Sequence, residues 1–229
     1  MNEGRPLNNG ENHNDFPLMR RPSSAVEKAA PGAKRILSGM VGDVLALFPF
    51  EDAEAQYHKG YEAYNREPGD FVEAVKWYRK AAEQGHPMAQ HNLGLCYYNG
   101  YGVPQDYSAA VKLWMKLALQ GYASTQFMIG GCYCFGHGVI QDTTEAVIWF
   151  RKAADQGDSQ AQYYLGNFYY TGHGVLQNYE QAVHWYRKAA EQGFAEAQSK
   201  LGLCYENGVG VQRDYAEAVK WSRLAAEQG

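Results

Sequence analysis

Residues 161–193 read AQYYLGNFYYTGHGVLQNYEQAVHWYRKAAEQG, and this stretch decides the fold because close copies of it recur along the chain. Each copy closes on a glycine, and these glycines stand 36 residues apart, at Gly85, Gly121, Gly157, Gly193 and Gly229. A fixed period of this size is typical of a solenoid, whose units are too small to bury their own apolar faces and therefore stack. We predict an all-α solenoid over residues 51–229, with about five repeats at 53–86, 87–122, 123–158, 159–194 and 195–229.

Each copy predicts two helices joined by a loop, called helix A and helix B in chain order. In the second copy we expect helix A near residues 88–98, the loop at 99–105 and helix B at 107–119. An Asp or Asn precedes every helix B, where its side chain accepts hydrogen bonds from free backbone N–H groups; these residues are Asp70, Asp106, Asp142, Asn178 and Asp214. A Glu or Gln three residues later in four copies predicts a capping box, in which that second side chain reaches back to the cap.

Small residues at fixed positions predict where the two helices of a repeat touch. Helix A carries a glycine in every copy, at Gly60, Gly94, Gly130, Gly166 and Gly202, and helix B carries a matching alanine. We expect large core residues around these contacts, namely Trp77, Leu113, Trp149, Trp185 and Trp221 with Tyr97, Tyr133, Tyr169 and Tyr205. A tryptophan stripe at fixed spacing indicates a core rather than a cofactor site, so no cofactor is expected.

Composition narrows the functional classes. The chain has 229 residues and a formal net charge of -4 with both signs interspersed, which gives no electrostatic case for binding nucleic acid. Cys96, Cys132 and Cys204 share one position with Phe168, which indicates small apolar packing residues. Neighbouring repeats would hold these sulfurs too far apart to bond. We therefore predict reduced thiols and, because no secretory signal or membrane span is visible, a cytoplasmic location.

The sequence before the repeats divides into two parts. Residues 1–32 lack apolar periodicity and are predicted to be a disordered tail, in which Ser23 follows a basic pair that resembles a kinase target, a match common by chance. Residues 33–50 are predicted to form a helix with an apolar face. That helix is expected to cap the first repeat, because terminal repeats need a cap; docking on a membrane or a partner is the alternative.

The repeated pattern resembles the Sel-1-like repeat, a relative of the tetratricopeptide repeat. The fourth copy carries the family signature at Ala161, Leu165, Gly166, Tyr169, Gly172, Gly174, Val175, Ala182, Trp185, Ala189 and Ala190, with Asn178 at the Asp position. The resemblance covers about residues 53–229 and implies a right-handed superhelix of antiparallel helix pairs. It also implies an adaptor that holds proteins together and has no catalytic site. The first copy departs from the signature, because its loop at 65–69 is two residues shorter and looks more like a tetratricopeptide loop.

The same resemblance suggests where a partner would bind. In tetratricopeptide relatives the concave groove is lined by helix A residues three before, one after and four after the glycine. We therefore predict a binding set for a protein or peptide partner at Tyr57, Tyr61, Tyr64, His91, Tyr98, Phe127, Tyr163, Asn167 and Tyr170. The remaining positions of that pattern are Leu95, Gly131, Cys134, Ser199, Leu203 and Glu206. Aromatic residues suit such a groove, since they dominate binding hot spots; the alternative is that several pack against the adjacent helix A and are half exposed.

Other functions are weaker alternatives. A chain tethered to a membrane or directed at a host through residues 36–50 is the runner-up, although membrane binding is unlikely on this composition. A β-lactamase-like enzyme, known among cysteine-rich relatives, is distant because the paired cysteines of those relatives are missing. His137 and His173 occupy equivalent loops but have no third ligand, so no metal site is predicted. Trp221 and Leu224 on the last helix would expose apolar area, which makes end-to-end self-association a hypothesis.

Overall fold

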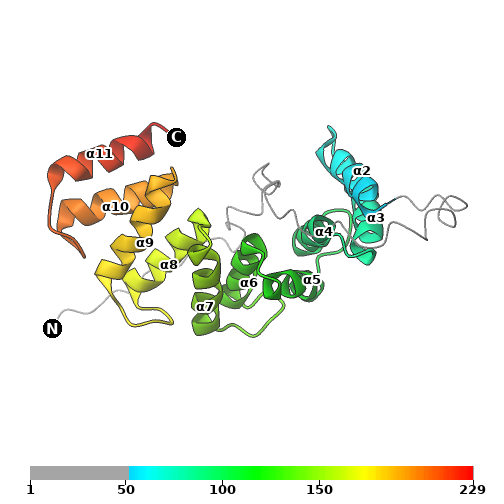
Figure 1. Ribbon diagram of the computed structural model, residues 1–229, viewed down its shortest axis with the longest axis horizontal. Coiled ribbons are helices and arrows are strands. Elements are labelled where there is room, and N and C mark those ends of the chain that lie inside the picture. The colour runs from blue at the N-terminus through cyan, green and yellow to red at the C-terminus, as the bar shows by residue number, and fades with distance from the viewer. Residues whose placement is uncertain (1–51, 229) are drawn as a thin grey trace, which may run out of the picture. The chain divides into compact units, whose positions relative to one another are not determined.

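The computed structural model describes residues 52–228, and within that range it consists of ten helices and no strand (Figure 1). The predicted tail, the helix predicted at 33–50 and Ser23 lie outside the described residues. The helices are α2 (Ala53–Asn65), α3 (Phe71–Glu83), α4 (Pro87–Asn99), α5 (Tyr107–Leu119), α6 (Ala123–Phe135), α7 (Thr143–Asp155), α8 (Ser159–Thr171), α9 (Tyr179–Glu191), α10 (Ala195–Asn207) and α11 (Tyr215–Ala226).

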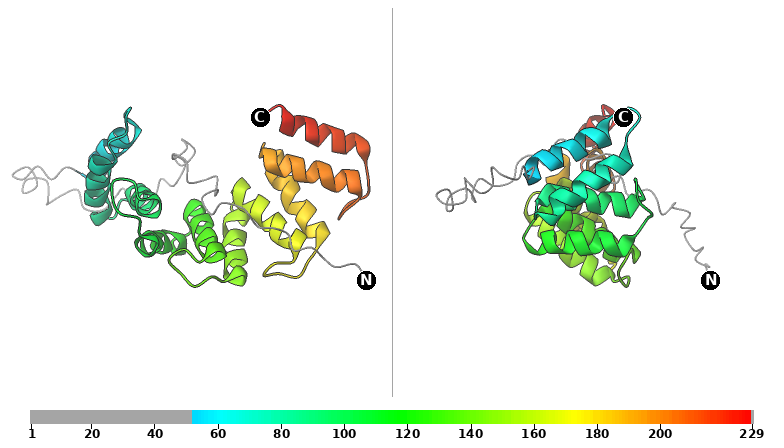
Figure 2. Two further views of the ribbon diagram at one scale, coloured as in Figure 1. Left: turned by 180° about the vertical axis from the view of Figure 1, so that it is seen from behind. Right: turned by 90° about the vertical axis from the view of Figure 1, so that its right-hand side faces the viewer.

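The helices pack in strict chain order. Each even-numbered helix is a helix A and packs on the helix B that follows it, and each helix B then packs on helix A of the next repeat. Figure 2 shows the same succession of helix pairs from behind. The prediction of an all-α solenoid of about five repeats is confirmed. In the second repeat helix B begins and ends as predicted, and helix A extends one residue beyond the prediction at each end.

The loops have two glycines, and each glycine is needed for a different structural reason. Gly100 ends α4 in the left-handed conformation, with φ of 74°, so that its N–H donates to the Cys96 carbonyl and closes the helix. Gly102 also has a positive φ, of 69°, and a Cβ placed on it would lie 2.2 Å from the Phe71 carbonyl oxygen. The loop therefore lies directly on the start of helix B in the preceding repeat, which only glycine permits.

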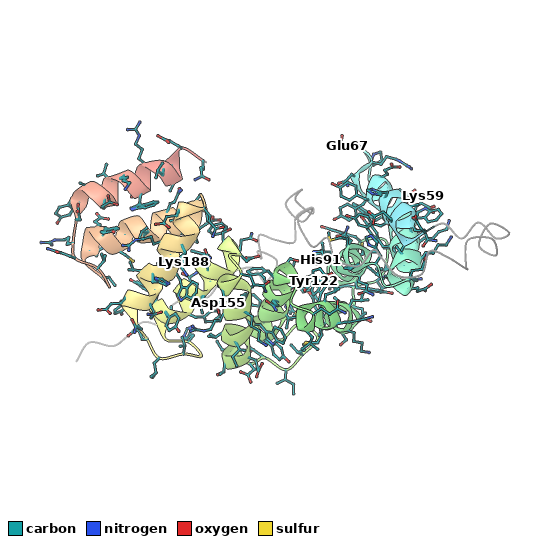
Figure 3. All side chains as sticks on the ribbon, in the orientation of Figure 1. Lys59, Glu67, His91, Tyr122, Asp155 and Lys188 are labelled. Carbon is teal, nitrogen blue, oxygen red and sulfur yellow. The ribbon has the colours of Figure 1, made fainter. Side chains whose placement is uncertain are left out.

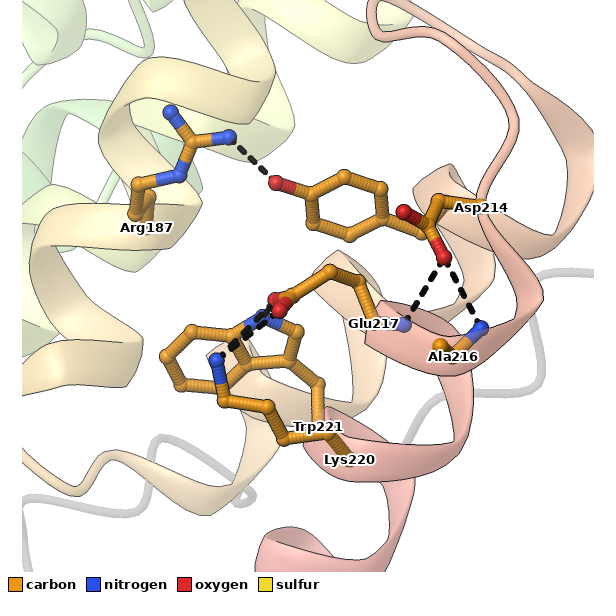
Figure 4. Close-up of polar contacts among 7 residues, drawn as sticks. Arg187, Asp214, Ala216, Glu217, Lys220 and Trp221 are labelled. Atoms are coloured by element: carbon orange, nitrogen blue, oxygen red, sulfur yellow. Dashed lines mark hydrogen bonds and ion pairs between the residues drawn. The ribbon is translucent and has the colours of Figure 1, made fainter.

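The N-caps of helix B are confirmed, but the predicted capping box is wrong. Asp214 Oδ1 accepts from the N–H groups of Ala216 at 2.9 Å and Glu217 at 3.1 Å (Figure 4). The Asp214 N–H, however, donates to the Tyr205 carbonyl at 3.0 Å, because the loop folds back on helix A. The Glu217 carboxylate is therefore free to accept from Trp221 Nε1 at 2.9 Å. The cap residues of the earlier repeats make the same bond to helix A, to the carbonyls of Ala63, Tyr97, Tyr133 and Tyr169.

The centre of the core lies one residue beyond the predicted tryptophan position. Fully buried aromatic rings follow that position in the first four repeats, at Tyr78, Trp114, Phe150 and Tyr186. They face the helix A glycines so closely that a Cβ on Gly94 would stand 2.2 Å from Trp114 Nε1. Of the predicted core residues, Trp149, Trp185 and Trp221 are buried, whereas Trp77, Leu113 and the four tyrosines are half-buried. The second group is therefore less buried than predicted, although Leu113, Tyr97, Tyr169 and Tyr205 pack against the buried clusters.

A ladder of glutamines joins the repeats and was not predicted. Gln162 is 4% exposed, and its Nε2 donates to the Ala154 carbonyl of the preceding repeat at 3.1 Å. Its Oε1 accepts from Gln192 Nε2 at 2.7 Å, so both ends of the buried amide are satisfied. The donation to the preceding repeat recurs at 3.1 Å for Gln90, Gln126 and Gln198. Each junction between repeats is therefore fixed by a buried hydrogen bond as well as by apolar packing.

Candidate partner-binding face

The predicted binding set lies on the A helices α2, α4, α6 and α8, and its exposure differs along the array. Tyr170 is 38% exposed. Tyr57, Tyr61, Tyr163 and Asn167 are half-buried, whereas Tyr64, His91, Tyr98 and Phe127 are buried. The other six positions divide in the same way: Leu95 and Gly131 are buried, Cys134 is half-buried, and Ser199, Leu203 and Glu206 are exposed. Accessible surface at these positions is thus concentrated in the first repeat and in the last two.

The residues three before the helix A glycine rest on the buried aromatic rings of helix B. The ring of Tyr163 on α8 lies 6.1 Å from that of Tyr186 on α9 and 5.3 Å from that of Phe194, which precedes α10. Tyr57 occupies the same position in α2, and its ring stacks on His86 at 4.7 Å. This position therefore contacts both helix B of its own repeat and the N-cap residue of the helix A that follows.

The residues four after the glycine close the seam between the two helices of a repeat. Tyr170 meets Tyr179, the first residue of α9, edge-on at 5.1 Å. Tyr64 with Phe71 at 5.1 Å and Tyr98 with Tyr107 at 4.8 Å repeat this arrangement. Packing in this set is thus mainly against helix B of the same repeat, whereas the sequence suggested the adjacent helix A. These aromatic side chains support the fold as well as presenting surface.

Asn167 is the one amide in the predicted set. Its Oδ1 accepts from the Tyr186 hydroxyl at 2.7 Å, so the hydroxyl of a deeply buried ring is paired at the surface of α8. Burial raises the pKa of Tyr186 far above its ordinary value, which keeps this hydroxyl protonated as the donor. Asn167 is therefore held in place by the core, with its side chain half-buried between the flanking tyrosines.

His91 is the least accessible titratable group of the set. It projects from α4 (Figure 3), and burial lowers the pKa of its imidazole to about 4, so the ring is neutral at neutral pH. Its Nδ1 has no hydrogen-bond partner among the described residues. The His91 carbonyl is paired, because it accepts from Trp114 Nε1 at 3.1 Å. A buried polar group without a partner costs stability, so the His91 imidazole destabilises α4 locally.

The two loop histidines have different surroundings. His137 stacks on Tyr107 with ring centroids 4.4 Å apart, and its Nδ1 lies 2.5 Å from the Tyr98 hydroxyl. It thereby joins two repeats, since Tyr98 and Tyr107 precede it by one repeat. His173 is exposed. In the described part of the chain no three His, Cys, Asp or Glu side chains gather as a metal site would require.

The four cysteines form no disulfide, and their thiols are weakly reactive. Cys96, Cys132 and Cys204 are at most 3% exposed, and Phe168 at the same position is 8% exposed, which confirms their assignment as packing residues. Burial raises the pKa of the Cys96 and Cys132 thiols to about 12 and of Cys134 and Cys204 to about 11. Because the thiolate is the nucleophile, these side chains are poorly suited to covalent catalysis.

Exposed apolar side chains occur outside the predicted set, and the sequence reasoning missed most of them. Ile140 and Leu176 occupy equivalent loop positions in adjacent repeats, and each is 90% exposed. On α11, Val219 is 68% and Tyr215 is 61% exposed. The signal for Val219 was present in the sequence, because a valine recurs at that position of every helix B and only the last has no helix after it in the described chain. None of the described helices is long and apolar enough to cross a membrane.

Comparison with known proteins identifies the repeat. The family model described as Sel1 repeat matches residues 53–86, 87–122, 123–158, 159–194 and 195–229. Among curated proteins, "DAP3-binding cell death enhancer 1" of Rattus norvegicus is 34% identical over 91 residues. That alignment covers 36% of this chain and only 18% of the relative, so the chain spans less than a fifth of that protein's length.

Two solved structures are similar over most of the chain. One is c5321, "a protective antigen present in uropathogenic Escherichia coli strains displaying an SLR fold", which is 39% identical with a TM-score of 0.74. The match covers 85% of this chain and 41% of that one. The other is a Sel1 repeat protein from Oxalobacter formigenes, 38% identical with a TM-score of 0.72, covering 77% of this chain and 52% of that one.

Proposed function

This chain belongs to the Sel1 repeat family, and we propose that it is a non-catalytic scaffold that binds a partner protein or peptide segment through the tyrosines of its A helices. Sel1 repeat proteins generally mediate protein–protein interaction, and the fold is not typically enzymatic. The name of the rat relative states that it binds DAP3, which supports a protein as the class of ligand. Because the chain covers so little of that relative, only the class is carried over to this protein.

The observation that carries the proposal is that accessible tyrosines of the set are held in place by the core. Tyr163 is half-buried between Tyr186 and Phe194, and Tyr170 is 38% exposed with its edge against Tyr179. An aromatic ring that is already fixed loses little entropy when a partner covers its free face, and it offers a large apolar area. Tyr163 and Tyr170 stand two turns apart on α8, a spacing suited to two anchors of one segment.

The chemistry of the set favours a partner with apolar anchors. Its nine members include six tyrosines and one phenylalanine, with no charged side chain apart from a histidine that burial keeps neutral. A helix or an extended segment with apolar side chains fits such a surface better than an acidic tail, which would need Lys or Arg partners. The proposed ligand is therefore an apolar segment of another protein.

The test is affinity capture with matched tyrosine variants. Tyr170→Ser removes an exposed ring of the set, and Tyr215→Ser removes a ring of 61% exposure on α11, outside the set. We expect the intact chain and Tyr215→Ser to retain the same captured protein, and Tyr170→Ser to lose most of it at unchanged helicity by circular dichroism. Equal capture by both variants would show that the tyrosines of the A helices do not carry binding.

The alternative of a membrane tether concerns residues 36–50, which lie outside the described residues. Its test is flotation of the intact chain with liposomes, compared with a chain that lacks residues 33–50. Binding that disappears with the deletion would favour the tether, and its absence in the intact chain would exclude it. The cytoplasmic location likewise stays a prediction.

A further inference from the structure

One position of helix B is buried in four repeats and exposed in the last. Val219 on α11 is 68% exposed. The valines at the same position of the four earlier B helices, Val75, Val111, Val147 and Val183, are between 4% and 7% exposed. The valine and the alanine before it are the same in all five repeats, so we attribute the difference to what packs on this position. In the first four repeats that neighbour is helix A of the next repeat.

The junction of α9 with α10 shows what the covering helix supplies. Val183 and Ala190 of α9 belong to one apolar cluster with Leu201 and Cys204 of α10. Leu201 is fully buried there, which places an aliphatic side chain of helix A in the middle of the contact. In this junction two turns of the covering helix α10 bury apolar area on α9. The equivalent area on α11 is exposed.

Two polar contacts complete the same junction. Gln198 Nε2 on α10 donates to the Ala190 carbonyl at 3.1 Å, and Arg187 on α9 donates to the Tyr205 hydroxyl at 2.7 Å (Figure 4). Gln198 and Tyr205 are seven residues apart, so the covering helix presents both along the same side of its aliphatic stripe. Together these contacts specify a docking pattern: Ala, Gln, Leu, Cys and Tyr at residues 197, 198, 201, 204 and 205.

The outward side of α11 presents the receptors for that pattern. Val219 replaces Val183, and Ala226, exposed at the end of the helix, replaces Ala190. Arg223 stands where Arg187 does, but its side chain pairs with Glu227, with 2.9 Å between Nε and Oε1 in an exposed ion pair. Such a surface pair contributes little, so Arg223 can be recruited by another acceptor.

We propose that the α11 face, formed by Val219, Arg223 and Ala226, is a second binding surface that takes one helix of a partner protein. The partner helix carries the pattern of helix A: a small residue followed by Gln, an aliphatic residue four positions after the small one, and Tyr four positions after the aliphatic one. Continuity with the four junctions inside the array supports this occupant, because all four join a valine of helix B to the Gln, aliphatic residue and Tyr of the next helix A. Three of the four also have the Arg, and the second has Met115 in its place. The surface is separate from the tyrosines of the A helices and does not depend on them.

A second copy of this chain is a poorer occupant. End-to-end pairing in the register of the array would bring α2 onto the α11 face. At the positions where other A helices have an aliphatic residue and Cys or Phe, α2 has Lys59 and Glu62. Both would be buried against Val219, and burying charged groups without well-made partners is costly.

The test uses a peptide with the sequence of residues 194–208, made helical by a lactam between Glu196 and Lys200, which are one turn apart and exposed in α10. The labelled peptide is titrated with the full chain by fluorescence polarisation. Val219→Lys places a charge in the proposed contact, whereas Ile148→Lys makes a comparable change on α7. Ile148 is 42% exposed at a position where repeats one, two and five have Lys, so this control is tolerated by the repeat.

We expect the chain and Ile148→Lys to bind the peptide equally and Val219→Lys to bind it at least about tenfold more weakly, because an ammonium group must be desolvated. A peptide with Leu201→Lys should not bind. Failure of the chain to bind the peptide, or equal binding by both variants, overturns the proposal. Light scattering provides the last arm: a dimer that Val219→Lys dissociates would show that a second copy occupies the face, and would also overturn it.

Discussion

The burial of His91 makes the stability of the array depend on pH between neutrality and pH 5. The imidazole has a pKa of about 4 in the folded chain, compared with an ordinary value of 6.5. Between these two pH values the unfolded chain binds a proton that the folded chain does not bind. Stability from this group is therefore fully present above pH 6.5 and is lost as the pH falls towards 4. Replacing His91 removes this contribution.

The size of the effect follows from the two pKa values. Going from pH 7 to pH 5, a single group with these pKa values lowers the free energy of unfolding by about 2 kcal/mol. His91→Phe is the suitable substitution, because Phe127 occupies the same position in the third repeat and is 1% exposed there. Other titrating groups, such as His184 and Asp158, contribute equally to both proteins and cancel in the comparison.

The assay is urea unfolding followed by circular dichroism, on the intact chain and His91→Phe, at pH 7 and pH 5. We expect the loss of unfolding free energy on acidification to be smaller by about 2 kcal/mol in the variant. The two proteins are compared in the loss of unfolding free energy between pH 7 and pH 5, and not in stability at one pH. The reason is that the substitution also changes packing at both pH values. Parallel losses in the two proteins would show that His91 is not shielded from solvent and would refute the reasoning.

Three further substitutions test the packing. Gly94→Ala should destabilise the chain by about 2–4 kcal/mol, since a Cβ there stands 2.2 Å from Trp114 Nε1; thermal unfolding measures this, and an unchanged midpoint contradicts it. Gln162→Leu should cost about 2 kcal/mol in urea unfolding, because it removes both buried hydrogen bonds of this amide, to the Ala154 carbonyl and from Gln192 Nε2. Ser222→Phe should add about 1–2 kcal/mol and slow hydrogen exchange in α11, since it supplies the ring that the last repeat lacks; faster exchange would contradict it.

The backbone of the repeats was predictable because short-range rules determine it. The Asp or Asn before helix B stops one helix from running into the next, and the paired loop glycines allow positive φ where the chain turns back. These signals act within a few residues, so one copy is enough to identify them, and the 36-residue period then multiplies the evidence. The bounds of α5 follow from such local chemistry alone.

The polar interior was not predictable from the same patterns. Gln162 recurs as Gln90, Gln126 and Gln198, but a recurring glutamine is equally expected on an exposed surface. Its burial depends on a backbone carbonyl supplied by the preceding repeat, which no pattern of side chains reveals. The capping box failed for a related reason: the N–H group that it would satisfy is already bonded to helix A.

The sequence could not divide the predicted binding set into buried and accessible residues. Phe127 is 1% and Tyr170 is 38% exposed, although the two side chains are chemically alike and both lie at predicted positions. Aromatic residues are favoured by core packing and by partner binding for the same reason, the apolar area that they bury. Only the helix B neighbours, such as Phe150 beneath Phe127 at 5.3 Å, decide which role each ring has.

The last repeat differs from the others at two positions of α11: in the residue type at 222 and in the exposure of Val219. Ser222 replaces the buried aromatic ring that packs on the helix A glycine in the first four repeats, so α11 is held on α10 with less apolar burial. On its other side, Val219 is left exposed. A helix that docks on Val219 would add the missing burial to α11, so binding there and ordering of the last repeat are thermodynamically linked. The Tyr170 surface lacks this linkage, because Tyr179 and the α9 core already hold it. Partner binding should therefore protect α11 from hydrogen exchange when it occurs at the α11 face, and leave α11 unchanged when it occurs at Tyr170.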